Sequence, residues 1–288
     1  MHNRNLGDTK VSGIGLGAMP LSSPNAVDEE RAVATIHAAL DAGITLIDTA
    51  DAYAPDSDSV GHNERVVAKA LATWPVDTSH VLVATKGGHT RTPDGGWGLN
   101  ASPDYLRRAC EASLRALGVD AIGLYQYHRP DPAVPYADSI GALAELRAAG
   151  KIRLVGISNA SIEQIDIARD VLGDGGLASV QNQFSPRFRS SEPELWHCHD
   201  HDIAFLPWSP LGGAARAGEL GERFLAFAEV AGELGASAQQ VALAWMLAKS
   251  PVVIPIPGCT RPLTARESAA AVDIVLGDDQ FARLDATA

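Results

Sequence analysis

Residues 44–53 read ITLIDTADAY, a short apolar run that ends in ionisable side chains. Its first half is rich in isoleucine and threonine, which favours a strand, and Asp48 and Tyr53 stand at the carboxyl end. In parallel α/β barrels the site lies where the strands end. The stretch therefore predicts a strand that delivers a carboxylate and a phenol to a site.

Seven further apolar runs have the same character: VSGIGLGAM from residue 11, HVLVATK from 80, IGLYQYH from 122, IRLVGISN from 152, ASVQNQF from 178, IAFLPWS from 203 and VVIPIPG from 252. Amphipathic stretches predict helices near residues 28–42, 62–74, 102–117, 136–150, 161–172, 192–201, 220–249 and 262–276. Eight strands alternating with eight helices predict the α/β class and a closed (β/α)8 TIM barrel. Residues 1–288 form a single domain in this interpretation, because no repeat or linker divides them.

The charge and cysteine content exclude several kinds of partner. The formal net charge is −12 and no run of Lys and Arg forms a basic patch, so nucleic acid is not expected. Three widely spaced cysteines predict neither a disulfide framework nor a metal clip. No apolar run reaches the roughly 18 residues of a membrane span, and the N-terminus lacks a secretory pattern, so we expect a cytoplasmic protein. The oligomeric state is not indicated.

The predicted strands end in an unusual set of residues. In chain order they are Asp48 with Tyr53, Lys86, His128, Ser158 with Asn159, Gln181, Trp208 with Ser209, and Gly258. Taken singly, Asp48 could cap a helix, Lys86 could lie on the rim and His128 could be a core histidine. Independent structural residues need not all fall at one end of a barrel, so together they indicate one site.

This set suits the reduction of a carbonyl group. Hydride transfer to the carbonyl carbon leaves negative charge on oxygen, which must be protonated or stabilised. Tyr53 can be the acid, and a nearby Lys86 would stabilise its phenolate and bring proton donation closer to neutral pH. Asp48 would hold Lys86, and a neutral His128 would orient the substrate oxygen.

These motifs resemble the aldo-keto reductases from about Val11 to Ala271. LIDTADAY is similar to the family segment that supplies the aspartate and tyrosine, VATKGG to its lysine strand, LYQYHRPDP to its histidine strand, and GHNERVVAKAL to the stretch after the tyrosine. The resemblance implies an NADPH-dependent carbonyl reductase with Asp48, Tyr53, Lys86 and His128 as the catalytic set.

The resemblance also implies a cofactor site. VGISN and VQNQFS would place Ser158, Asn159 and Gln181 on the nicotinamide carboxamide, and FLPWSPLGG would stack Trp208 on the nicotinamide ring, where tyrosine or phenylalanine is usual. Backbone N–H groups of Ser209, Leu211 and Gly212 would follow the pyrophosphate. Gly258, Thr260 and Arg261 would lie near the 2′-phosphate, and Glu267 and Ser268 near the adenine, although asparagine is usual at Ser268.

Cofactor preference and substrate are less determined. Arg261 suits a phosphate, so we expect NADPH rather than NADH. By position, Met19, Trp97 and Arg129, with Tyr53, form pocket walls, and the long C-terminal loop that closes the pocket in some relatives is not expected. The chain resembles bacterial pyridoxal reductases within the family, which makes pyridoxal a candidate beside generic aldehydes and sugar-derived carbonyls.

The sequence also contains partial signals for two other kinds of site, a dinucleotide-binding loop and a metal site. Gly13, Gly15 and Gly17 follow an apolar start, but the spacing is G-x-G-x-G and not the G-x-G-x-x-G of a dinucleotide-binding Rossmann fold. His197 and His201 would share one helix face, as metal ligands often do. No further ligand set is evident in the sequence and hydride transfer needs no metal, so no metal site is predicted.

Two other functions remain open. Lys86 at a strand end could form a Schiff base, as in barrel lyases, although the later serine, asparagine, glutamine and tryptophan have a nicotinamide role and no lyase role. Barrels of this family also serve as nicotinamide-binding regulatory subunits without turnover. The intact Asp, Tyr, Lys and His set favours catalysis.

Overall fold

A computed structural model describes residues 2–22, 27–213 and 216–287. Its strands are β1 (Asn3–Leu6), β2 (Thr9–Ser12), β3 (Leu16–Gly17), β4 (Leu46–Asp48), β5 (Leu82–Gly87), β6 (His89–Arg91), β7 (Trp97–Leu99), β8 (Ile122–Tyr127), β9 (Ile152–Ser158), β10 (Leu177–Gln181) and β11 (Ala204–Phe205). Its α-helices are α1 (Glu29–Asp41), α2 (His62–Thr73), α3 (Pro103–Leu117), α4 (Tyr136–Ala148), α5 (Ile162–Leu172), α6 (Glu192–Asp200), α7 (Leu220–Arg223), α8 (Leu225–Leu234), α9 (Ala238–Lys249), α10 (Pro262–Ala270) and α11 (Asp278–Asp285).

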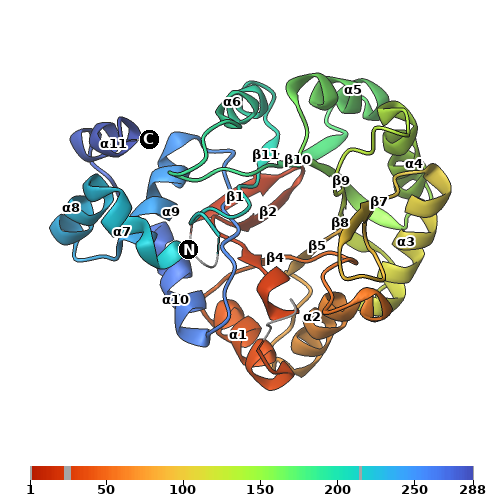
Figure 1. The fold of residues 1–288 in the computed structure, drawn as a ribbon, viewed down its shortest axis with the longest axis horizontal. Helices are drawn as coiled ribbons and strands as arrows, with labels where there is room; N and C mark the ends of the chain where they lie inside the picture. Colours follow the sequence, from red (N-terminus) through yellow and green to blue (C-terminus); the bar gives the residue numbers. More distant parts are fainter. Residues whose placement is uncertain (1, 23–26, 214–215, 288) are drawn as a thin grey trace.

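The central sheet is parallel and has seven strands in the order β3-β4-β5-β8-β9-β10-β11. Residues 252–258, the eighth predicted run, close it into a barrel. Ile254 N–H donates to the Phe205 carbonyl at 2.8 Å on one side, and the Gly17 N–H donates to the Pro257 carbonyl at 3.0 Å on the other. The (β/α)8 barrel predicted from the sequence is therefore confirmed (Figure 1).

Prolines explain why the closing segment pairs through isolated bridges and not through a regular ladder. Pro255 and Pro257 have no N–H group, so on the β3 side this segment can only accept hydrogen bonds. Both carbonyls accept, from Gly15 and Gly17 respectively. At this seam the two backbone segments also approach closely, since a Cβ on Gly17 would lie 2.8 Å from the Ile256 carbonyl oxygen.

The antiparallel hairpin β1–β2 covers the amino-terminal end of the barrel. Leu6 and Val11 from the hairpin are buried in one cluster with inward-facing strand residues such as Leu46, Leu124 and Ile254. This apolar plug leaves the opposite, carboxyl end of the strands free for polar residues.

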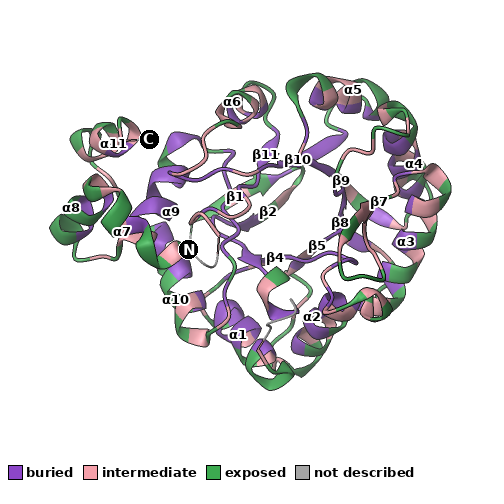
Figure 2. Ribbon diagram, in the orientation of Figure 1, coloured by how far each residue is buried: buried purple, intermediate pink, exposed green. Residues whose placement is uncertain are grey.

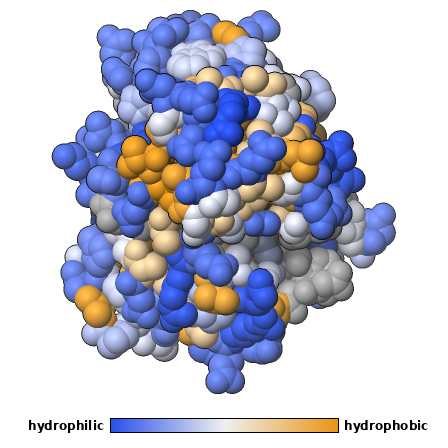
Figure 3. All heavy atoms as spheres, turned by 90° about the vertical axis from the view of Figure 1, so that its left-hand side faces the viewer, coloured by the Kyte–Doolittle hydropathy of each residue, from blue (hydrophilic) through white to orange (hydrophobic). Residues whose placement is uncertain are grey.

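Helices α1 to α6, with α9 and α10, surround the strands, whereas α8 and α11 lie further out (Figure 1). The strands of the central sheet and the inner helix faces are mostly buried, and the outer helix faces are exposed (Figure 2). Figure 3, which views the molecule from the α8 and α11 side, shows a mainly hydrophilic surface crossed by a band of hydrophobic side chains. Leu225 and Val275 are the most exposed large apolar residues of that region.

Local sequence sets the helix ends. Ser161 accepts from the Gln164 N–H while the Gln164 side chain accepts from the Ser161 N–H, which forms a capping box at the start of α5. Ser102 caps α3, whose first residue is Pro103, and Gly118 ends that helix with a φ of 68°. These starts and stops agree with the expected ones.

Three expectations about elements were wrong. The predicted helix 220–249 is three helices, because Phe224 has an extended φ of −121° and Gly235, with a φ of 63°, ends α8. The first predicted strand, 11–19, contains the end of β2 and the separate β3. No strand was predicted between residues 87 and 101, where the structure has the hairpin β6–β7, and α11 was not predicted.

None of the helices in the described ranges is long and apolar enough to cross a membrane.

We predict that Gly17→Ala weakens the closed barrel. A Cβ at this position would lie 2.8 Å from the Ile256 carbonyl oxygen, a backbone atom of the closing segment that cannot move aside without opening the seam. The expected loss is about 1 to 3 kcal/mol of unfolding free energy, measured by denaturant unfolding followed by circular dichroism.

Gly141→Ala in α4 is the matched control. Nothing lies within 4 Å of its added Cβ, so the alanine should raise stability by roughly 0.5 to 1 kcal/mol. Equal unfolding midpoints for the two variants would show that the seam is not strained by the added methyl group.

Candidate active site

Adjacent strands bring the four catalytic candidates together. Asp48 ends β4, Lys86 lies near the end of β5 and His128 directly follows β8, and these strands are neighbours in the sheet. Tyr53 lies in the loop after β4, where its backbone N–H donates to the Ala50 carbonyl. All four side chains therefore meet at the carboxyl end of the barrel.

Lys86 is the centre of this group. Its Nζ donates to Asp48 Oδ2 at 2.7 Å, to the Thr49 carbonyl at 2.8 Å and to the Tyr53 hydroxyl at 3.2 Å. Its side chain is fully buried. The three donors of the ammonium are thus all used, and one of them is directed at the phenol.

Two glutamines hold the second oxygen of Asp48. Oδ1 accepts from Gln181 Nε2 at 2.7 Å and from Gln126 Nε2 at 3.2 Å. Gln126 was missed in the sequence analysis. The period of two along a strand was the available signal, because Gln126 lies two residues before His128 and shares its face.

Burial and nearby charge have opposite effects on the pKa values of Lys86 and Tyr53. Burial alone would lower the pKa of Lys86, but the charge of Asp48, aided by Tyr53, raises that pKa above its ordinary value, so the amine stays protonated. Burial raises the pKa of Tyr53, and the opposing effect of Lys86 is smaller. Lys86 thus acts on the pKa of Tyr53 in the expected direction, and burial sets the net direction.

His128 contributes an uncharged imidazole. Burial, followed by the nearby charge of Lys86, holds the pKa of His128 well below its ordinary value. The ring meets Tyr53 edge-on, with centroids 5.6 Å apart. Its Nδ1 is buried without a hydrogen-bond partner among the described residues.

A cavity of about 710 Å³ opens beside these side chains. The residues predicted as pocket walls, Met19, Trp97 and Arg129, line it together with Tyr53 and His128. The other lining residues are Gly17, Pro20, Asp48, His89, Gly98, Leu99, Ser158, Asn159, Gln181, Trp208, Ser209, Pro210, Leu211, Gly213, Ala217, Ile256, Pro257 and Gly258.

The residues expected at the nicotinamide are linked in one network on the cavity wall. Trp208 Nε1 donates to Asn159 Oδ1 at 3.2 Å, and Asn159 Nδ2 donates to the His128 carbonyl at 3.0 Å. Ser158 Oγ donates to the Gln181 carbonyl at 2.8 Å. A tyrosine or phenylalanine at position 208 has no N–H to make the contact with Asn159.

The loop after β11 has an unusual backbone. Ser209, Gly212 and Gly213 all have positive φ, of 50°, 82° and 93°, and the Gly212 N–H donates to the Ser209 carbonyl at 2.9 Å within a turn. Gly212 borders a small recess and not the main cavity. That recess is also lined by three guanidinium groups that the sequence analysis did not single out: Arg187, Arg216 and Arg223.

Of the residues expected at the adenosine end, Gly258 lines the main cavity and the other four do not. Thr260 lies beyond it, and Arg261 is exposed and caps α10 through its backbone position. Glu267 is exposed, whereas Ser268 is buried, with its hydroxyl 3.8 Å from Cys259 Sγ. Because that hydroxyl faces the interior, Ser268 is poorly placed to bind an adenine.

The hairpin β6–β7 supplies part of the cavity mouth that sequence reasoning missed. His89 stacks on Trp97 with centroids 4.4 Å apart, and the Arg91 guanidinium lies 4.4 Å from the same indole. Burial, with the charges of Arg129 and Arg91, lowers the pKa of His89 to about 4. The mouth is therefore aromatic, with its positive charge carried by arginine.

Comparisons with known proteins agree with this architecture. The model of the aldo/keto reductase family matches residues 13–288. An uncharacterized oxidoreductase of Schizosaccharomyces pombe is 35% identical over 97% of this chain and 88% of its own length. Pyridoxine 4-dehydrogenase of Escherichia coli is 30% identical over 97% and 96% of the two chains.

A crystal structure of an aldo/keto reductase from Klebsiella pneumoniae in complex with NADP and acetate has a TM-score of 0.81 and 30% sequence identity. The match covers 98% of this chain and 93% of that one. With the family model matching nearly every residue of the barrel, the chain belongs to the aldo/keto reductase family.

Proposed function

We propose that this protein reduces an aldehyde or ketone to an alcohol with NADPH, and that Tyr53 donates the proton. The observation that carries the proposal is the 3.2 Å contact between Lys86 Nζ and the Tyr53 hydroxyl in the wall of the 710 Å³ cavity. A phenol next to a permanently charged, buried ammonium can give up a proton to an oxygen that becomes negative.

Three features of the chain fit NADPH. The cavity volume falls within the range of about 300 to 1,000 Å³ typical of ligand pockets, and Trp208 offers an aromatic wall. Arginines, which suit phosphate groups, border the recess beside Gly212. The similar Klebsiella protein was crystallised with NADP. When bound, NADPH would supply the hydride.

The chain's own residues then divide the remaining work. His128 is uncharged, so it can donate a hydrogen bond to the substrate oxygen without competing for the proton. Tyr53 gives its proton to that oxygen, and Lys86 stabilises the phenolate that remains. Asp48 and its two glutamines keep Lys86 in place, which makes them positioning residues.

The Schiff-base lyase and the regulatory subunit are less well supported. A Schiff base requires a neutral, accessible amine, whereas Lys86 is buried, paired with Asp48 and held protonated. A purely regulatory barrel has no need of the Tyr53, Lys86 and His128 contacts.

The substrate class follows from the mouth of the cavity. Trp97 and His89 provide flat aromatic walls, and Arg129 adds a positive charge. A planar aromatic aldehyde such as pyridoxal suits this lining, and similarity to pyridoxine 4-dehydrogenase supports the choice.

The three buried, free cysteines are compatible with a cytoplasmic location.

Tyr53→Phe is expected to lower kcat for pyridoxal and 4-nitrobenzaldehyde by at least two orders of magnitude, measured as NADPH oxidation. NADPH affinity should change little, because the hydroxyl is needed only in the transition state. Tyr136→Phe is the control, since that buried hydroxyl has no partner among the described residues and lies outside the cavity lining. Undiminished turnover in Tyr53→Phe would remove Tyr53 as the acid.

The pH dependence of alcohol oxidation reports the pKa of Tyr53, because this direction needs the phenolate. In the wild type the rate should rise at alkaline pH, since burial raises that pKa, while reduction stays constant through neutral pH. Lys86→Met removes a charge that lowers the pKa, so the rise should move to higher pH.

Lys86→Met disturbs a buried pair, so circular dichroism must show that the variant is folded. An alkaline rise that stays in place in Lys86→Met would contradict the assignment of the profile to Tyr53.

NADPH should bind at least roughly tenfold more tightly than NADH in a fluorescence titration, and Arg261→Leu should bring the two Kd values together, because one charge-assisted contact to the 2′-phosphate is lost. Arg266→Leu changes the net charge equally on another face of α10 and should keep the preference. If Arg261→Leu weakens NADH and NADPH alike, Arg261 does not recognise the 2′-phosphate.

A further inference from the structure

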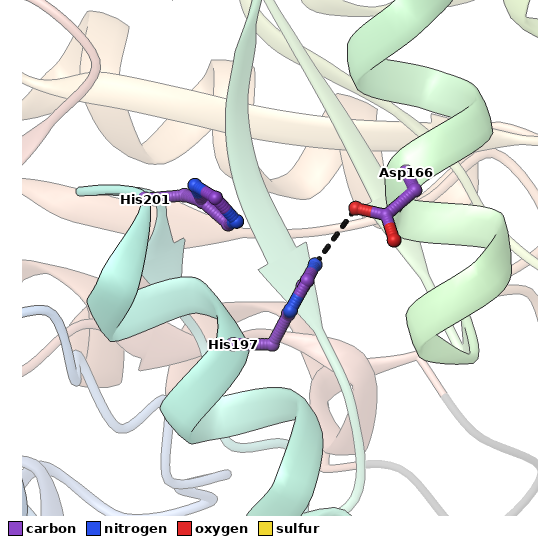
Figure 4. Close-up of side chains that lie close together, drawn as sticks. All are labelled: Asp166, His197 and His201. Carbon is purple, nitrogen blue, oxygen red and sulfur yellow. Dashed lines mark hydrogen bonds and ion pairs between the residues drawn. The ribbon is translucent and has the colours of Figure 1, made fainter.

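A second cluster of ionisable side chains lies outside the barrel mouth, between α5 and α6. Asp166 comes from α5, His197 from α6, and His201 from the residue that ends α6. One ligand atom from each lies within 4.8 Å of the others, and His197 Nε2 is 2.8 Å from Asp166 Oδ1. Figure 4 shows the two imidazoles and the carboxylate directed into one gap between the helices.

We propose that Asp166, His197 and His201 bind a divalent transition-metal ion, Zn²⁺, which joins α5 to α6. Two imidazoles and one carboxylate are a common zinc donor set, with water as the fourth ligand. None of the three residues lines the 710 Å³ cavity. The site is therefore separate from the proposed reaction.

The present geometry is close to a zinc site and requires a small adjustment. Ligand distances of about 2.0 to 2.2 Å place tetrahedral donors roughly 3.3 Å apart. The His197 and Asp166 atoms are already at 2.8 Å, so the change falls mainly on His201. That residue is exposed, and its ring can turn without disturbing the core.

The carboxylate at the site favours binding of a cation, and a neighbouring guanidinium competes with that cation. Burial opposes ionisation of Asp166, but hydrogen bonds from His197 and Arg169 hold its pKa below the ordinary value, so it is a carboxylate at neutral pH. Arg169 Nη1 lies 3.0 Å from the same Oδ1. Because the guanidinium repels a metal ion and occupies a ligand oxygen, it should weaken binding until it turns away.

This site departs from the prediction of no metal. The sequence showed the histidine pair, but the third ligand lies 31 positions away from His197 on another helix. Only the packing of α5 beside α6 brings Asp166 to the pair.

The experiment is a zinc titration of protein without a polyhistidine tag, by isothermal titration calorimetry above the ordinary imidazole pKa of about 6.5. We expect one Zn²⁺ per chain and a higher thermal midpoint when zinc is present. His201→Ala should weaken binding at least tenfold and abolish the rise in thermal midpoint. His80→Ala removes an exposed histidine elsewhere and should change neither.

Arg169→Gln provides an opposite test, because loss of the competing guanidinium should tighten zinc binding at least severalfold. Turnover in all three variants should match the wild type, which shows that each is folded. Absence of stoichiometric binding in the wild type, or equal affinity in His201→Ala, overturns the proposal. So does weaker binding in Arg169→Gln.

Discussion

The buried ammonium of Lys86 is the constraint on which the site depends. A charge removed from water must be paired and hydrogen-bonded, and here all three donors have acceptors, from Asp48, the Thr49 carbonyl and Tyr53. Asp48 is held in turn by Gln181 from β10, which is not a neighbour of β4 in the sheet. The contact therefore crosses the barrel interior, which is possible because the sheet is curved into a barrel.

The same burial decides the protonation states around Lys86. It raises the pKa of Tyr53 more than the lysine lowers it, and it keeps His128 uncharged. A protonated phenol, an uncharged imidazole and a fixed cation then surround one side of the cavity. This is the state in which a carbonyl oxygen can receive a proton, and charge that develops on it is stabilised by groups already in position. The low polarity of the site thus favours the proton donor, although it opposes the phenolate.

What the sequence could predict follows from the regularity of parallel strands. The eight runs, and the placement of Asp48, Lys86 and His128 at strand ends, follow from alternation and from the common direction of the strands. The hairpin β6–β7 could not be predicted from its glycine-rich sequence, because its strands are short and its aromatic contacts are tertiary. Residues 220–249 have a continuous helix-like sequence pattern. Their division into three helices depends on the backbone at Phe224 and Gly235, so it could not be predicted. Ser268 was placed at the adenine, but packing turns its hydroxyl toward Cys259.

Trp208 links the wall proposed to bind the cofactor to the wall proposed to carry catalysis. Its indole N–H fixes Asn159, and Asn159 in turn holds the backbone of His128. Asn159 has a φ of 58°, a conformation that asparagine tolerates better than most residues, and this turn directs its amide toward both partners. A tryptophan at this position therefore does more than offer a stacking surface. Through Asn159, the position of the indole, which would contact the nicotinamide, is linked to the end of β8, where His128 lies. The amide side chain of Asn159 thus fixes the two walls of the cavity relative to each other.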